Sequence, residues 1–453
     1  MLLLMLLAGT VAGVRLAGFL GSVVNLQDPL AAVQKQVEPP AGSILYKLSH
    51  GQRVNLLLLG YGGDENDAPY LTDSMMVVAI DPSSHRAMEV SVPRDLVVSI
   101  DAFRSHPPAL EKINAAYEIG MDDASWPAKR PEYEGRKAGG RLAMDTVGRV
   151  TGLQFDGFLA MDFKGFRDLV SALGGVQVCL DQRLDDNLYP DYHDGYIKGG
   201  IHFPAGCQTV DGEQALQLAR SRHAIQPEQA SDYGRARRQQ LLLSAIRSKA
   251  SSLDAVSRAP QLLDALQKNF VTSLDLPDMQ ALYRWGAHLS DGSIGHFGIS
   301  EADLLDAFQF RKGTCGDPGV WVLCPIDPSF GAVKAFFAAL FVDPKVLAEA
   351  APVEVANASA TLDDLGSRVT NVLRPLGFQV ADPIRRRTQE RSTVYDFSGG
   401  RYPETARWMA AYFGANVVTV TPATPAPAGA PPGTGGVVVL LGRDYALHWI
   451  GQA

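Results

Sequence analysis

Three short apolar runs most constrain what this chain can fold into. They cover residues 54–59, 74–80 and 87–92, and each is bounded by glycine or proline. Nearly continuous apolar runs of this length are typical of strands buried on both faces of a sheet. Helical patterns follow them, and strands mixed with helices predict a layered α/β domain. These helical patterns cover residues 111–120, 141–151, 163–173, 212–220, 233–251 and 253–289.

A second, smaller domain is predicted after a change in composition at residues 341–352. From residue 353 strand and helix patterns mix again, and a Pro/Ala/Thr/Gly-rich segment at 421–436 is typical of a flexible insertion. We therefore expect a large α/β domain over 53–340 and a small one over 350–447. The second domain is expected to hold strands at 353–356, 378–380, 392–396, 416–421 and 437–441, and helices at 362–376 and 404–413.

The first 24 residues are apolar apart from Thr10, Arg15 and Ser22. As a helix they extend roughly 36 Å, enough to cross a bilayer, although Arg15 costs on the order of 3 kcal/mol near the centre. We expect an uncleaved, single-pass signal-anchor and a stalk over 25–52, which place the rest of the chain outside the membrane. A cleaved signal peptide and a buried helix are the alternatives, because the run lacks a basic flank and an A-x-A site.

Four cysteines fall into two pairs that suit disulfide bonds. Cys179 and Cys207 flank a polar Tyr/Asp/Gly-rich stretch, which we expect to be a surface loop. Cys315 and Cys324 bracket a Gly/Pro-rich loop. Neither pair has the C-x-x-C spacing of a metal site, and disulfides indicate an oxidising compartment. Four unpaired thiols in a cytosolic protein are the alternative.

Arginine is concentrated in one stretch of 19 residues, although the chain carries a net charge of -8, which argues against a nucleic-acid partner. Arg235 and Gln239 are spaced i, i+4 on an expected helix, so they project from one face, with Arg238 beside them. Arg220 and Arg222 lie two residues apart and share a side if the backbone is extended. Guanidinium groups match phosphate oxygens, so the cluster predicts a phosphate site; a solvated basic face is the alternative.

Further candidates lie at the ends of the expected strands. Asp73 directly precedes one strand, and Arg94 and Asp95 directly follow another, which is where α/β sheets place ligands. Asp73 is a candidate ligand for Mg²⁺, which binds few carboxylates together with substrate phosphates. Lys112 and Asn114 open a helical pattern and are candidates for contacts with phosphate or sugar oxygens. A strand-end salt bridge and an ordinary amphipathic helix are the alternatives.

Motifs for a P-loop, a serine-hydrolase elbow and a zinc protease are absent from the sequence. Six ordered motifs instead resemble the LytR-CpsA-Psr family over roughly residues 53–250, and residues 353–445 resemble the LytR C-terminal domain more loosely. The resemblance implies an α/β three-layer fold with a central mixed sheet flanked by helices on both faces, and a hydrophobic cavity for a polyisoprenoid tail. The motifs are LTDSMM (71–76), SVPRD (91–95), KINAAY (112–117), DGEQAL (211–216), ARSR (219–222) and DYGRARRQQ (232–240).

The resemblance also implies an activity and assigns residues to it. The activity is transfer of a glycan phosphate from a polyprenyl-pyrophosphate carrier to peptidoglycan at the membrane. Asp73 falls on a Mg²⁺-ligand position and Lys112 on a position near the phosphates. Relatives often carry a second metal-binding Asp just after the first strand; here Asp64 serves from a shifted position or that ligand is lost. The pyrophosphate-binding positions are Arg94, Arg220, Arg222, Arg235 and Gln239.

Two other functions fit the same residues. One is a non-catalytic regulator that binds polyprenyl phosphate, and the other is a pyrophosphatase that uses water as the acceptor. For transfer, Asp95 is expected either to hold an arginine or to act as a base.

Overall fold

The structure is a computed structural model that describes residues 39–64, 66–191, 195–230, 232–250, 270–286, 289–298, 308–310, 322–325, 328–433 and 435–449. It divides into two compact units, Met1–Gly148 with Gln154–Ile294, and Arg149–Leu153 with Gly295–Ala453. The predicted domain limits of 53–340 and 350–447 stay predictions. The predicted signal-anchor lies outside the described residues. Within the described part, no helix has the length and apolar character needed to cross a membrane.

The three apolar runs form adjacent strands of a mixed sheet in the first unit, which confirms the prediction for the core. Strands β1 and β2 are antiparallel, with Leu57 opposite Val77, while β1 and β6 are parallel, with Leu57 opposite Phe158. Leu57, Val77 and Phe158 are all fully buried. Within this unit the strands follow the order β11-β6-β1-β2-β3. Their bounds are β1 (Val54–Tyr61), β2 (Thr72–Asp81), β3 (Arg86–Val92), β6 (Gly157–Asp162) and β11 (Phe270–Thr272).

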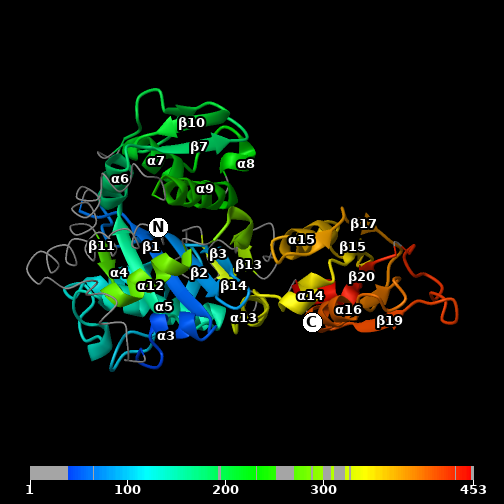
Figure 1. Ribbon diagram of the computed structural model, residues 1–453. Coiled ribbons are helices and arrows are strands. Elements are labelled where there is room, and N and C mark those ends of the chain that lie inside the picture. Colours follow the sequence, from blue (N-terminus) through cyan, green and yellow to red (C-terminus); the bar gives the residue numbers. More distant parts are fainter. Residues whose placement is uncertain are drawn as a thin grey trace, which may run out of the picture. The chain divides into compact units, whose positions relative to one another are not determined.

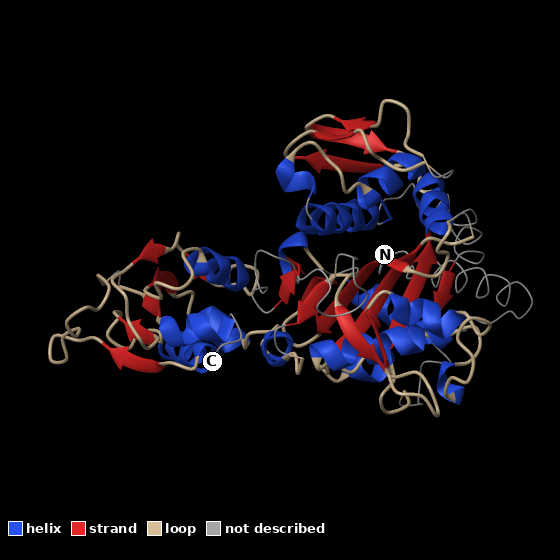
Figure 2. Cartoon of the chain, turned by 180° about the vertical axis from the view of Figure 1, so that it is seen from behind, coloured by secondary structure: helices blue, strands red, loops and turns tan. Residues whose placement is uncertain are grey.

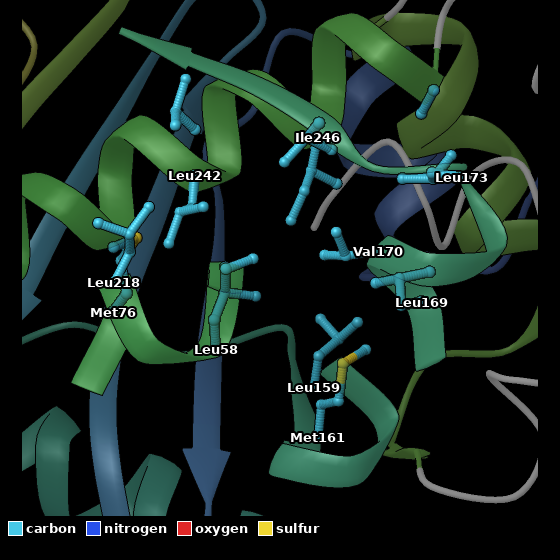
Figure 3. Close-up of a cluster of buried hydrophobic side chains, with 14 of the residues drawn as sticks. Leu58, Met76, Leu159, Met161, Leu169, Val170, Leu173, Leu218, Leu242 and Ile246 are labelled. Carbon is cyan, nitrogen blue, oxygen red and sulfur yellow. The ribbon is translucent and has the colours of Figure 1, made fainter. Parts of the chain in front are cut away.

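Helices cover both faces of this sheet (Figures 1 and 2). On one face, apolar side chains of α7 and α9 meet those of β1 and β2; Figure 3 shows Leu58 and Met76 opposite Leu218 and Leu242. On the other face α5 packs so tightly that a Cβ at Gly140 would lie 2.1 Å from the Phe158 ring. The helices of this unit are α3 (Ile44–Ser49), α4 (Ala115–Met121), α5 (Ala138–Thr151), α6 (Phe163–Ala172), α7 (Gly212–Arg220), α8 (Pro227–Ala230), α9 (Asp232–Ala250) and α12 (Leu276–Gly286).

The stretch between Cys179 and Cys207 is more ordered than a surface loop. These cysteines lie opposite each other on antiparallel strands and form a disulfide, as predicted. Between them a second antiparallel pair buries Leu184 and Phe203. The prediction of a surface loop was therefore wrong for these strands. The four strands are β7 (Val176–Leu180), β8 (Leu184–Asp186), β9 (Ile201–Phe203) and β10 (Gly206–Val210).

Several other boundaries differ from the predictions. The predicted helix at 111–120 begins with a strand, because Lys112 pairs opposite Val97 before α4 starts. Residues 44–49, predicted as stalk, form α3, whose Ile44 is buried. Within the predicted helix at 253–289, residues 270–272 form β11 against β6. Cys315 lies outside the described residues, so its pairing with Cys324 stays a prediction. The short elements here are β4 (Val97–Ile100), β5 (Ala109–Lys112) and the 3₁₀ helices η1 (Pro131–Tyr133) and η2 (Asp291–Ser293).

The second unit holds its own α/β sheet, as predicted. Its strands follow the order β16-β15-β20-β18-β19, and β17 also pairs with β15. Strands β15 and β20 are parallel, and Val355 and Val439 lie opposite each other in the fully buried centre. The strands of this sheet are β15 (Pro352–Asn357), β16 (Gln379–Val380), β17 (Ile384–Arg385), β18 (Thr393–Asp396), β19 (Asn416–Thr419) and β20 (Val437–Leu441). The short strands before it, which do not belong to this sheet, are β12 (Ile294–Gly298), β13 (Phe308–Phe310) and β14 (Leu323–Pro325). The helices are α13 (Gly331–Ala338), α14 (Pro344–Ala348), α15 (Leu365–Leu373), α16 (Pro403–Phe413) and α17 (Arg443–Trp449).

Candidate functional site: an arginine-lined cavity

A cavity of about 270 Å³ lies in the first unit between the sheet and helices α6, α7 and α9. Part of its wall is apolar, with Leu58 and Met76 from the sheet and Phe166 and Leu243 from the helices. The remainder is strongly cationic. The predicted residues that line it are Asp73, Arg94, Arg220, Arg222, Arg235 and Gln239, which come from four separate segments of the sequence.

Asp95 organises the cations at one edge of the cavity without lining it. Its carboxylate lies 3.4 Å from Arg94 Nε, 3.0 Å from Lys112 Nζ and 3.8 Å from Arg222 Nη2. Burial opposes ionisation of this carboxyl group, yet Arg94, Lys112 and Arg222 together lower the pKa of Asp95. An ionised carboxylate shared by three cations is a poor proton acceptor, so the geometry favours the predicted holding role over the role of a base.

Arg94 connects this cluster with Asp73. It follows β3, and its guanidinium donates to Asp73 Oδ1 at the start of β2. Both side chains line the cavity. Arg94 thus positions Asp73 at the edge of the sheet, where the end of a strand borders the cavity.

Arg220 is held by aromatic rings. Its guanidinium lies over the Phe163 ring, 4.4 Å from the centroid, and 5.8 Å from the centroid of Tyr189. An arginine stacked on ring faces keeps its in-plane N–H groups directed to other acceptors. Arg220 is the last residue of α7, so the helix end delivers it to the cavity.

Helix α9 carries Arg235 and Gln239, and the structure places both in the cavity wall, as the i, i+4 spacing predicted. Arg235 is almost fully buried, and the Gln239 side-chain amide donates to the Ala219 carbonyl at 3.2 Å. This contact ties α9 to the end of α7. The arginines of the two helices therefore face a common space.

Arg238 lies outside the cavity lining, and its predicted contact with substrate stays a prediction. It is buried, and it donates to the carbonyl oxygens of Leu218 and Gln229, each at 2.8 Å. Burial, with Arg235 adding repulsion, lowers the pKa of Arg238 to about 10, so it remains charged at neutral pH. Arg238 is absent from the cavity lining and joins α9 to α7 and α8.

Asn114 and Asp64 are also absent from the cavity lining. Asn114 is buried, and its carbonyl accepts from the backbone N–H and the hydroxyl of Thr72, which sets the start of β2 beside Asp73. Asp64 is exposed and does not line the cavity. Lys112 acts through Asp95 and is likewise outside the lining.

Two functional residues escaped the sequence analysis. Asp162, at the end of β6, lines the cavity and accepts from the backbone N–H of Gly165, and burial raises its pKa. Asp186 is fully buried, and its Oδ2 accepts from the Ser221 hydroxyl at 2.7 Å and from the backbone N–H of Arg222 at 3.2 Å. Asp186 thus fixes the turn that carries Arg222 into the cavity.

The donor set fits a hard cation only if the ligand adds oxygen atoms. Asp73 and Asp162 both present carboxylates to the cavity. Among the described residues no group of three or more His, Cys, Asp or Glu side chains is arranged to hold a metal ion. Mg²⁺ commonly uses one or two carboxylates and completes its shell with phosphate oxygens and water. The residues therefore suit Mg²⁺ that arrives with a phosphate ligand.

Fold and site together define an α/β protein with a cavity whose wall is partly apolar and partly lined by arginines. The model of the LytR_cpsA_psr family matches residues 22–303, more than half of the chain, and the chain therefore belongs to this family. A second model, described as LytR cell envelope-related transcriptional attenuator, matches residues 350–445. These matches confirm the resemblance found in the motifs.

Similar proteins include the polyisoprenyl-teichoic acid–peptidoglycan teichoic acid transferase TagU of Oceanobacillus iheyensis, 29% identical over 264 residues, which are 58% of this chain and 71% of that protein. TagU of Bacillus mycoides is 27% identical over 266 residues, 58% of this chain and 75% of that protein. Among solved structures, B. subtilis TagV is 20% identical with a TM-score of 0.45, over 63% of this chain and 96% of that one. TagT bound to LI-WTA is 23% identical with a TM-score of 0.44, over 63% and 89%.

Proposed function

We propose that this chain is a glycopolymer–peptidoglycan phosphotransferase that moves a glycan phosphate from a polyprenyl-pyrophosphate carrier to peptidoglycan. The observation that carries the proposal is the cavity, in which an apolar wall adjoins Arg94, Arg220, Arg222 and Arg235. That combination suits a lipid whose head is a pyrophosphate. The relatives named as teichoic acid transferases support the same reaction class.

In the proposed reaction an acceptor hydroxyl attacks the phosphorus that carries the glycan. A P–O bond forms to the acceptor, the bond to the lipid phosphate breaks, and the hydroxyl proton is released. Phosphoryl-type transfer depends mainly on positioning and charge stabilisation. The arginines neutralise the pyrophosphate and the departing lipid phosphate. Leu58, Met76 and Leu243 hold the first part of the prenyl chain.

Mg²⁺ is proposed as the cofactor, and when bound it neutralises phosphate charge beside the arginines. Asp73 would hold it, and Asp162 takes the place that the sequence assigned to Asp64, because Asp162 lines the cavity and Asp64 does not. Asp95 serves as a positioning residue that keeps Arg94 and Arg222 together. Residues 1–24 are proposed to anchor the chain in the membrane, with both units outside it. The Cys179–Cys207 disulfide supports an oxidising compartment.

The test is a transfer assay with a purified lipid-pyrophosphate-linked glycan, Mg²⁺ and peptidoglycan oligomers. The proposal expects glycan attached to the oligomers and lipid phosphate in equal amount. Release of lipid phosphate without an acceptor would instead indicate a pyrophosphatase. Tight binding of the lipid with no turnover in complete reactions would indicate a regulator, and either result would overturn the proposed transfer.

A further inference from the structure

A second group of arginines lies in the other unit, at the end of β17 and on the segment that follows it. Residues 385–391 read RRRTQER, and the four arginines among them are exposed. Arg443, at the start of α17, is also exposed. It lies near the same segment, because its Nη1 is 3.9 Å from Glu390 Oε2. None of these side chains belongs to the cavity of the first unit.

The charges of this group are only partly compensated. Arg385 lies 3.3 Å from Asp363, and Arg443 approaches Glu390 as described. Arg386, Arg387 and Arg391 have no carboxylate partner among the residues that the structure describes. We define these three side chains as the open arginine patch. Three uncompensated guanidinium groups on one short segment contrast with the acidic charge of the whole chain.

The backbone of this segment is held by the sheet. Arg386 N–H donates to the carbonyl of Asn357 at 2.8 Å, and Gln389 N–H donates to the carbonyl of Ala358 at 2.9 Å. Asn357 is the last residue of β15, so the segment crosses the carboxyl end of this parallel strand. A positioned backbone lowers the ordering cost when a ligand binds, which distinguishes the patch from charges on a free loop.

The segment that passes beside the patch adds no charge of its own. The segment 421–436 contains no charged residue, and it passes beside Gln389, since a Cβ at Gly429 would lie 3.0 Å from the Gln389 side-chain nitrogen. The exposed large hydrophobic side chains of the described residues are Leu45, Leu110, Leu188, Tyr196, Ile225 and Val417, and none belongs to residues 381–391. Surfaces that lie on membranes combine basic with apolar side chains, so this composition favours a soluble polyanion.

We propose that the open arginine patch binds a polyanionic glycan chain that carries repeated phosphate groups. Guanidinium forks match phosphate oxygens, and several exposed contacts along one chain add up to useful affinity although each is weak. The choice of a phosphate polymer rests on the proposed function, in which the transferred glycan is such a chain. The patch then binds a part of the polymer that is remote from the end that reacts.

The experiment measures binding of poly(glycerol phosphate) to the full chain by calorimetry in a nonionic detergent. The patch variant replaces Arg386, Arg387 and Arg391 with Gln. The matched control replaces three exposed arginines of the same unit, Arg374, Arg401 and Arg407, with Gln, which gives the same change in net charge. We expect affinity to fall at least about tenfold in the patch variant and less than about twofold in the control, and higher salt to weaken binding of the unmodified chain.

Equal loss in the two variants, or equal binding of a neutral dextran, would overturn the proposal. So would patch-dependent binding to phosphatidylglycerol vesicles without binding of the polymer, which would assign the patch to a membrane surface. The polymer carries neither lipid nor pyrophosphate, so its binding does not depend on transfer. A chain that binds the polymer through the patch but transfers nothing would count against the proposed function alone.

Discussion

The arginines of the two units differ in the partners that hold their side chains. In the first unit Arg94 and Arg222 share Asp95, and Arg220 lies over Phe163. In the second unit Arg386 and Arg387 are exposed and lack such a carboxylate among the described residues. A charge that loses part of its hydration needs a fixed partner because desolvation is costly, while a fully hydrated charge relies on water and counterions. These cavity arginines, each held by a carboxylate or a ring, therefore suit one ligand in one geometry, and the open arginine patch suits a long and variable chain.

The comparison fails if transfer does not depend on the arginines that line the cavity. Arg94→Ala removes a cation from the cavity and leaves Asp73 without its arginine partner. We expect transfer to the acceptor to fall about 10²–10³-fold, in line with the loss of a preorganised electrostatic contact. The rate of lipid-phosphate release in the complete assay measures this. Arg407→Gln, an exposed change on α16, is the control, and similar rates for the two variants would contradict the assignment.

Arg238 tests whether burial alone makes an arginine part of the active site. Arg238→Met leaves the buried carbonyl groups of Leu218 and Ser221 without this donor. We expect the free energy of unfolding to fall by about 2–4 kcal/mol, because unsatisfied buried polar groups are costly. Urea denaturation measures it. A variant of unchanged stability with abolished transfer would instead place Arg238 among the ligand-binding residues.

Asp95 allows a sharper test of the comparison, because it is a carboxylate partner of a kind that the open arginine patch lacks. Asp95→Asn keeps the shape but removes the charge shared by Arg94, Lys112 and Arg222. We expect kcat/KM for the lipid carrier to fall about tenfold, chiefly through KM, as the cations lose their common anchor. The cations around Asp95 lower its pKa, which disfavours its action as the base. The variant should therefore keep the pH profile of kcat, and loss of a basic limb would show that Asp95 accepts a proton.

The smallest effect concerns an exposed histidine beside a buried carboxylate. His202 Nδ1 lies 2.8 Å from Asp185 Oδ1, and this contact raises the pKa of His202. The stabilisation is complete below the unfolded pKa, about 6.5, and is lost as pH rises through the folded value above it. The Tm of the unmodified chain should fall slightly more between about pH 6 and pH 8 than that of His202→Gln. Identical pH dependence would show that the contact contributes nothing.

Much of the cavity could be predicted because its residues follow regular spacing. The i, i+4 spacing placed Arg235 and Gln239 on one helix face, and both line the cavity. Arg94, which follows a strand, also lines it. The apolar runs of β1 to β3 are short but nearly continuous, so they identify the core of the sheet directly. Strands and helix faces of this kind can be predicted from local periodicity alone, without knowledge of contacts between distant residues.

What escaped prediction depends on distant contacts. Asp186 lies in an aperiodic polar stretch, and only the folded chain brings it to Ser221, 35 residues away. Asp162 ends a strand that the apolar pattern did not reveal. In the sequence, Arg238 cannot be told apart from the neighbouring arginines; its carbonyl partners distinguish it in the structure. Sequence spacing shows which charges share a face, but it does not show which of them a neighbouring element covers.

The disulfide between β7 and β10 has a consequence for the integrity of the chain. Cys179 and Cys207 are separated by 28 positions, and the segment between them carries Asp186, while α7 begins soon after the second cysteine. A single proteolytic cut in this segment would leave both fragments covalently joined. The cut protein would migrate as one chain until a reductant is added, and the arginines beyond the cut would stay attached to the sheet that faces them.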